Sequence, residues 1–160
     1  MIARALALGA AIAALAAPSA AAGDTPAAPA AAAGGTPPPR AQLSGFVCRQ
    51  AQNPLNRLIE ITATMRPISG TERMAMRFQL LEALPWAPYH QIYGGDLDMW
   101  RHPNPPTFGQ QPGDTWIVNK PVANLHAPAR YRFRVKFKWT AWSGQVTTVT
   151  HLSSVCHEPE

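Results

Sequence analysis

Ten consecutive residues, Arg130–Trp139, alternate strictly between cationic and apolar side chains. Successive side chains of a β-strand point to opposite faces of a sheet, so this pattern predicts a strand with one basic and one apolar face. Burying unpaired cations would cost roughly several kcal/mol each, so we expect the apolar set to fill a core and the basic set to point to solvent. The apolar set is Tyr131, Phe133, Val135, Phe137 and Trp139, and the basic set is Arg130, Arg132, Arg134, Lys136 and Lys138.

Other segments also carry strand patterns, bounded by clusters of Gly, Pro and Ser that mark turns. They are Ser44–Gln50, Leu58–Arg66, Met74–Leu80, Tyr89–Tyr93, Thr115–Val118 and Val146–Ser154. The chain holds 17 Pro in 160 residues, and Pro breaks helix interiors, so the composition argues against a helix bundle. We therefore predict an all-β fold, an immunoglobulin-like β-sandwich of about seven antiparallel strands. A small barrel is the alternative.

The two cysteines, Cys48 and Cys156, stand near the two ends of the strand-rich region. An even number of cysteines in an exported protein favours a disulfide, and two cysteines allow one intramolecular pairing. Metal binding is the poorer alternative, because no set of His or Cys residues stands at ligand spacing beside either cysteine, and the adjacent His157 alone does not make a site. We predict a bridge that closes the domain from its N-terminal to its C-terminal end.

The N-terminus has the pattern of a secretory signal peptide over residues 1–22. Arg4 precedes an unbroken apolar run over residues 5–17, and small residues follow, so that cleavage after Ala20 or after Ala22 fits equally well. The run is shorter than the roughly 20 residues of a membrane-spanning helix. We therefore expect a cleaved signal, with no transmembrane segment after cleavage; an uncleaved anchor is the alternative.

Residues 23–42 are rich in Pro and Ala and predict a disordered, semi-extended linker. It is either a tether that holds the domain away from a membrane or wall, or a loose mature N-terminus. The folded domain is expected over residues 43–160. The leader places the protein outside the cytoplasm, either secreted or associated with the cell envelope.

A group of residues around the start of the alternating strand carries a local resemblance to a known family. The residues are Leu125, Pro128, Tyr131, Phe133, Val135 and Gly144. This stretch resembles the corner before strand F, and strand F itself, of fibronectin type III and related immunoglobulin-like, bacterial adhesion-type sandwich domains. The resemblance implies that the Tyr131 hydroxyl anchors the corner by a hydrogen bond to upstream backbone, with Leu125 packed under the ring.

Motifs of the common enzyme classes are absent from the sequence. There is no G-x-S-x-G elbow, no phosphate-binding glycine loop, and no second His to complete a zinc-protease motif after His157. Asp96 and Asp98 offer too few oxygen donors for calcium, so we expect a solvated turn there. We predict no catalytic residue, no metal and no cofactor. A small secreted enzyme whose site assembles from distant residues is the alternative.

The distribution of positive charge suggests a binding surface. The chain has 14 Lys and Arg against 9 Asp and Glu. We define the basic face as Arg77, Arg130, Arg132, Arg134, Lys136 and Lys138. No acid is expected beside it, since the outward positions predicted on the flanking strands are Ala75, Arg77 and Gln79 on one side and Thr147, Val149 and His151 on the other.

The basic face predicts a non-catalytic binding or adhesion-type module for an anionic envelope polymer, an acidic polysaccharide, a lipid surface or another protein. Nucleic acid is not expected, because the leader directs the protein out of the cytoplasm. A face that only keeps the protein soluble is one alternative. Carbohydrate binding by exposed aromatic residues is another. The aromatic residues concerned are Trp86, Tyr89, Tyr93, Trp100 and Trp116.

Overall fold

The computed structural model describes residues 37–160, and the predicted signal peptide and most of the predicted linker lie outside this range. The strands are β1 (Ala41–Arg49), β2 (Leu58–Met65), β3 (Thr71–Ala83), β4 (His90–Ile92), β5 (Trp100–Arg101), β6 (Trp116–Ala123), β7 (Ala129–Ala141), β8 (Val146–Leu152) and β9 (Cys156–Glu158), with a short 3-10 turn η1 (Pro54–Asn56). All seven predicted strands form, and β5 and β9 are two short additions. The predicted all-β class is confirmed.

Strand β1 begins inside the segment that we predicted as linker. Ala41 and Gln42 pair with Met65 and Thr64 of β2, and the Arg66 amide donates to the Arg40 carbonyl. The backbone hydrogen bonds of the sheet order these residues although their side chains are small or polar. The predicted domain start at residue 43 is therefore late.

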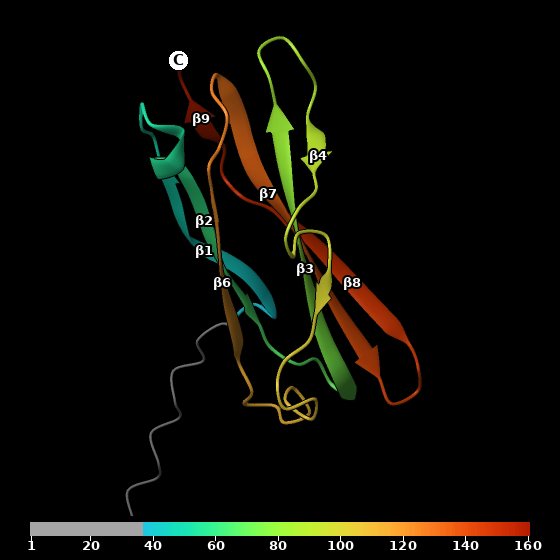
Figure 1. Ribbon diagram of the computed structural model, residues 1–160. Coiled ribbons are helices and arrows are strands. Elements are labelled where there is room, and N and C mark those ends of the chain that lie inside the picture. Colours follow the sequence, from blue (N-terminus) through green and yellow to red (C-terminus); the bar gives the residue numbers. More distant parts are fainter. Residues whose placement is uncertain (1–36) are drawn as a thin grey trace, which may run out of the picture. The chain divides into compact units, whose positions relative to one another are not determined.

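The strands form two antiparallel sheets that pack face to face (Figure 1). The smaller sheet has the order β1-β2-β6 and the larger sheet the order β4-β3-β7-β8, with β5 beside β3 and β9 beside β7. Without the short β5 and β9, the first, second and fifth strands (β1, β2 and β6) form one sheet, and the third, sixth and seventh (β3, β7 and β8) lie in the other. Immunoglobulin-like sandwiches divide these strands in the same way. Along each strand, alternate residues point to the inner face of its sheet, toward the other sheet.

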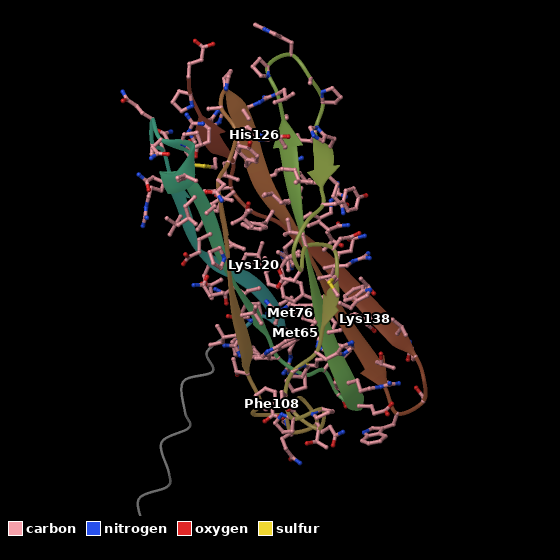
Figure 2. The ribbon with its side chains drawn as sticks, viewed as in Figure 1. Met65, Met76, Phe108, Lys120, His126 and Lys138 are labelled. Carbon is pink, nitrogen blue, oxygen red and sulfur yellow. A yellow bond between two sulfur atoms is a disulfide. The ribbon has the colours of Figure 1, made fainter. Side chains whose placement is uncertain are left out.

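The core lies between the two sheets. Ile59, Ile61 and Met65 come from the smaller sheet, and Met76 and Phe78 come from the larger one; Figure 2 labels Met65 and Met76 in this layer. All five residues of the predicted apolar set of β7 are buried: Tyr131, Phe133, Val135, Phe137 and Trp139. The predicted partition of this strand into a buried face and a basic face is confirmed.

The predicted disulfide is confirmed. Cys48 in β1 and Cys156 at the start of β9 are joined, with their Cα atoms 5.3 Å apart and 108 positions between them in sequence. Since β1 belongs to the smaller sheet and β9 pairs with the larger one, the bridge joins the two layers at one end of the sandwich.

Tyr131 holds the corner between β6 and β7 as the family resemblance implies. Its hydroxyl lies 3.0 Å from the carbonyl oxygen of His126, five residues upstream, and 2.5 Å from Glu82 Oε1. Both Tyr131 and Leu125 are buried in the same core cluster. Burial and the neighbouring Glu82 raise the pKa of Tyr131, so its hydroxyl keeps its proton as a donor.

The outward positions that we predicted for β8 are wrong. Trp139, Phe137 and Val135 lie opposite Thr147, Val149 and His151, so these residues of β8 share the inner side of the sheet. Directly opposed residues of antiparallel strands point to the same face, and the turn at residues 141–145 sets this register. The outward residues of β8 are Val146, Thr148, Thr150 and Leu152.

Candidate binding face

The basic face lies on the outer side of the larger sheet, along the central strand β7. Arg134 stands between Gln79 of β3 and Leu152 of β8, and Lys136 stands between Arg77 and Thr150. Arg130 is exposed, while the other four cations of β7 are half-buried. The basic face is therefore one row of cations with uncharged neighbours on the β8 side.

Two aromatic rings cover part of the basic face, which corrects the prediction of a fully solvated stripe. The Arg132 guanidinium lies 4.4 Å from the centre of the Tyr89 ring, and Arg130 lies 5.7 Å from it. Lys138 Nζ lies 4.4 Å from the centre of the Trp100 ring, and Arg77 lies 4.7 Å from it. The segment between β3 and β6 pairs along the edge of β3 through β4 and β5, and Trp100 lies directly opposite Arg77, so its ring is on the outer side of the sheet. The outward residues Ala75, Leu81 and Ala83 of β3 are buried.

An acid does reach the basic face, contrary to our prediction. Asp98 lies 3.5 Å from Arg77 and accepts a hydrogen bond of 2.7 Å from Gln79. This hydrogen bond, together with the nearby Arg77 and Lys136, holds the pKa of Asp98 below its usual value. Asp96 instead pairs with Lys120 of β6 and with Arg101, so the pair of carboxylates does not form a simple solvated turn. The Lys120 hydrogen bond also lowers the pKa of Asp96.

Among the described residues, the basic face has six cations and one neighbouring acid, Asp98, so most of its positive charge is not neutralised. Within residues 37–160, none of the five cations of β7 has a carboxylate oxygen within 4 Å. Arg77 Nε and Arg132 Nε are buried and have no hydrogen-bond partner there. The faces of Tyr89 and Trp100 stabilise the covered cations by cation–π attraction, worth about 0.5–2 kcal/mol each. Within the described part of the chain, Arg134 and Lys136 have neither an aromatic ring over them nor a salt bridge.

A hollow opens at the Arg130 end of the basic face. Arg130 and Pro85 line two adjoining depressions of about 280 and 290 Å³. Trp86 lines one of them, is fully exposed, and has a backbone φ of 64°. A bulky residue at positive φ is strained, so both the exposure and the conformation of Trp86 cost stability.

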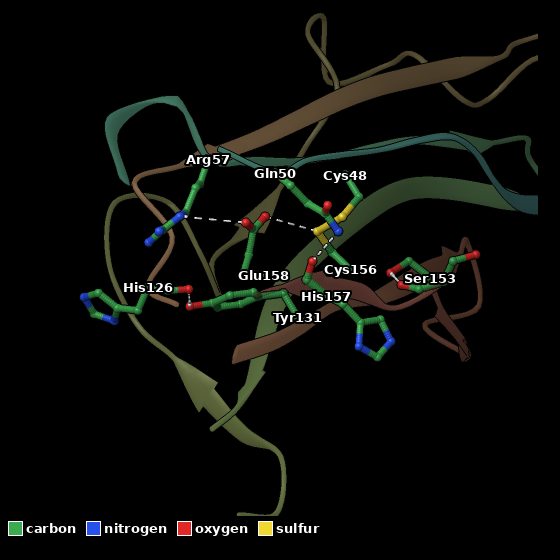
Figure 3. Close-up of a disulfide and its surroundings, with 10 residues drawn as sticks. Cys48, Gln50, Arg57, His126, Tyr131, Ser153, Cys156, His157 and Glu158 are labelled. Carbon is green, nitrogen blue, oxygen red and sulfur yellow. Dashed lines mark hydrogen bonds and ion pairs between the residues drawn. A yellow bond between two sulfur atoms is a disulfide. The ribbon is translucent and has the colours of Figure 1, made fainter. Parts of the chain in front are cut away.

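The end of the sandwich around the disulfide holds the other group of buried charges (Figure 3). Arg57 donates to the carbonyls of Ala51, Gln52 and Leu125, and its Nε lies 3.9 Å from Glu158 Oε2. Burial raises the pKa of Glu158, although the charge of Arg57 acts against that shift. Among the described residues, Arg57 finds its acceptors in backbone carbonyls, whereas Glu158 Oε2 is buried without a hydrogen-bond partner.

Two of the histidines lie beside one buried carboxylate, Glu82. His90 Nε2 lies 3.2 Å and His126 Nδ1 lies 3.6 Å from the carboxylate of Glu82, which also contacts the Tyr131 hydroxyl. Among the described residues, no Ser or Thr hydroxyl is hydrogen-bonded to a histidine side chain.

One cluster of metal-ligand types occurs in the part of the chain that the structure describes. Cys48, Cys156 and Glu158 bring their ligand atoms within 4.8 Å of one another. Both cysteines are in the disulfide, and a metal needs the thiolate, so the cluster is not suited to bind an ion.

Sequence reasoning identified the cations but missed their partners. Tyr89 and Trp100 figured among candidate sugar-binding aromatics, and Asp98 was expected in solvent. Tyr93 and Trp86 are exposed, whereas Trp116 packs partly against the core. The contacts with β7 join residues that are about 40 positions apart, and no local pattern encodes them.

No family model, no curated protein and no solved structure matches this chain. Residues 37–160 contain no helix with the length and apolar character that crossing a membrane requires. The candidate site therefore has to be judged from its own chemistry.

Proposed function

We propose that this chain is a non-catalytic binding module, exported from the cytoplasm, whose basic face binds an acidic polysaccharide. The observation that carries the proposal is the row of five cations on β7 with no carboxylate partner among the described residues. The signal-like leader and the disulfide support a location outside the cytoplasm.

The spacing of the cations favours a polyanion over a single small anion. Residues two apart on a strand are separated by about 7 Å, which is within the Debye length of about 8 Å at physiological salt. The cations of β7 therefore repel one another, and a chain of carboxylates or sulfates along the strand would relieve the repulsion at several points together. The neighbouring residues on β8 are the uncharged Thr148, Thr150 and Leu152, so they do not repel a polyanion bound along β7.

The aromatic cover prepares part of the basic face for binding. Arg132 is held under Tyr89, and Lys138 is held against Trp100. Ordering a long side chain on binding costs about 0.5–1.5 kcal/mol, so a cation that is already held loses less conformational freedom when an anion arrives. A guanidinium also presents its donors in a fixed plane that matches a carboxylate or sulfate.

The hollow at Arg130 favours a saccharide as the anionic ligand. An exposed indole can stack on the apolar face of a sugar ring, and Arg130 lies beside Trp86 in the same depression. A sugar acid would satisfy both groups, whereas a simple anion would use only the guanidinium. Binding of neutral sugars by Trp86 alone is the second candidate function.

The test is affinity for heparin and for a neutral dextran, measured over a range of salt concentrations. Arg134→Gln with Lys136→Gln removes the two uncovered cations and should weaken heparin binding by about tenfold or more. Arg49→Gln with Arg66→Gln is the matched control in and beside the smaller sheet, and it should change affinity by less than about threefold. Absence of heparin binding at low salt, or equal losses in both double variants, would refute the proposal.

A second pair of variants tests the saccharide. Trp86→Ala should weaken heparin binding, whereas Trp142→Ala, at an exposed Trp beyond the far end of β7, should not. Binding of inorganic sulfate should be the same in both variants. If dextran binds as tightly as heparin and the affinity does not change with salt, the second candidate function holds instead.

A further inference from the structure

The outer edges of the two sheets differ in how they are protected against pairing with another strand. Natural proteins protect exposed edges with charges, prolines, bulges or very short strands. In residues 37–160, β1 has a bulge between Ser44 and Val47, and β6 carries Lys120 and Pro121. The strands β4 and β9 have three residues each. Strand β8 has seven residues, VTTVTHL, with no Lys, Arg, Asp, Glu or Pro and no bulge.

The backbone hydrogen bonds show which groups of β8 point away from the sheet. The Ala141 amide donates to the Gln145 carbonyl, and the Ser153 amide donates to the Phe133 carbonyl, each at 2.9 Å. Hydrogen-bonded and non-hydrogen-bonded pairs alternate along an antiparallel ladder. The odd residues of β8 therefore bond to β7, and the amides and carbonyls of the even residues point outward. These even residues are Val146, Thr148, Thr150 and Leu152.

We propose that β8 is a dimerisation edge, on which β8 of a second copy of this chain pairs antiparallel about Val149. The sequence is complementary to itself in this register. Val146 lies opposite Leu152 of the second copy, Thr148 lies opposite Thr150, and Val149 lies opposite its own copy. Apolar pairs and Thr–Thr pairs across strands are favourable, and no like charges meet. The β8 edges of two copies therefore match each other in length, polarity and charge.

The exposed apolar side chains of β8 also favour a second copy as the occupant. Val146, Val149 and Leu152 are among the exposed large hydrophobic residues of the chain. The proposed register brings each of them against another of the three, so a dimer reduces the exposure of all three in both copies. A partner with a charged or proline-containing strand would leave at least one of them unmatched.

The dimer would place both basic faces on the same side of one continuous sheet. Opposed residues of antiparallel strands point to the same face, so the outward Thr148 and Thr150 of both copies lie on one surface. The two β7 strands would be separated by three strand spacings, about 14–15 Å. This consequence for polyanion binding depends on the proposed function, whereas the dimer itself does not.

Sedimentation velocity of the exported chain over a concentration series tests the proposal. The wild type should shift from monomer to dimer, with a dissociation constant of about 1–100 μM, because one strand edge buries a small area. Thr148→Pro removes an outward amide and leaves the bonds to β7 intact, so it should raise the dissociation constant by about tenfold or more. Val149→Lys puts two like charges directly opposite each other and should act in the same direction.

Thr62→Lys is the control, since Thr62 lies on the half-buried outer face of the central strand β2, and it should shift the constant by less than about twofold. Circular dichroism checks that each variant is folded, and either edge variant suffices if the other unfolds. A wild type that stays monomeric at about 1 mM, or a dimer unchanged by a folded edge variant, would overturn the proposal. Heparin binding by the monomeric variants would show that the basic face acts without the dimer.

Discussion

The disulfide end of the sandwich and the basic face both contain clustered charges, but the charges of the two regions have different partners. At the disulfide end, Arg57 has three carbonyl acceptors and lies near Glu158, and Glu82 contacts Tyr131 and two histidines. On the basic face, Arg134 and Lys136 have no acidic partner among the described residues. The cation at the disulfide end, Arg57, is held by contacts within the chain, whereas Arg134 and Lys136 of β7 remain available to a ligand.

We therefore expect the disulfide end to determine the stability of the fold and the basic face to determine ligand binding. A change at the disulfide end should alter the free energy of unfolding and leave heparin binding intact in the folded fraction. A change on the basic face should do the reverse. The variants below test this division, beginning with the one expected to have the largest effect on stability.

Loss of the disulfide should have the largest effect. Cys48→Ser with Cys156→Ser removes a bridge between residues 108 positions apart and should lower the free energy of unfolding by about 4–5 kcal/mol. Urea unfolding followed by tryptophan fluorescence measures the change. Thiol alkylation and mass spectrometry of the unreduced wild type should find no modified cysteine. Two alkylated cysteines, or a loss below about 1 kcal/mol, would contradict the structural role of the bridge.

Loss of the Tyr131 hydroxyl should have an intermediate effect. Tyr131→Phe leaves the buried Glu82 carboxylate and the partly buried His126 carbonyl without their donor, which should lower the free energy of unfolding by about 1–3 kcal/mol. Tyr89→Phe is the matched control, because no hydrogen bond of the Tyr89 hydroxyl occurs within residues 37–160. Equal effects of the two substitutions would show that the corner hydrogen bond contributes nothing.

Glu158 should make stability depend on pH. Burial raises the pKa of its carboxyl above the usual 4.5, so the folded chain holds this proton more tightly than the unfolded chain does. The stabilisation by the protonated form is complete below about pH 4.5 and is lost as the pH rises through the raised pKa. Glu158→Gln should remove this part of the pH dependence, with a smaller change in stability than Tyr131→Phe. Urea unfolding from pH 4 to pH 7 compares the two chains, and identical pH profiles would refute the assignment.

Neutralising the uncovered cations should have the smallest effect on folding. Arg134→Gln with Lys136→Gln should change the free energy of unfolding by less than about 1 kcal/mol, because partly exposed charges contribute little. Relief of repulsion along β7 makes the expected change slightly stabilising. Thermal unfolding of the double variant at low and high salt measures it. A loss above about 2 kcal/mol would mean that these cations serve the fold, and the division between the two regions would fail.

Much of the fold could be predicted because its information is local. The alternation in Arg130–Trp139 specified both faces of β7, and turn residues located the other six main strands. The two cysteines allowed one pairing. The Tyr131 corner followed from a local resemblance, and its bond to the His126 carbonyl is local, whereas its second partner, Glu82, comes from the distant strand β3.

The errors arose where the outcome depends on contacts between distant segments. The register of β8 is set by the length of the turn at residues 141–145, and a change of one residue there exchanges the inward and outward sets. The contacts of Tyr89 and Trp100 with the cations of β7 depend on where the segment between β3 and β6 pairs along β3. No periodicity in the sequence predicts this pairing. Asp98 reaches Arg77 for the same reason.

The position of the disulfide also determines how the domain would respond to mechanical force. A load applied between residue 37 and residue 160 reaches the sulfur atoms at Cys48 and Cys156 before it reaches the segment between them. The covalent path then carries the tension, and β2 to β8 experience almost none of it. Of the main strands, only the part of β1 before Cys48 can be peeled from its neighbour. The oxidised domain would therefore extend by a few residues under tension and keep the basic face folded, whereas the reduced domain could be unravelled along its whole length.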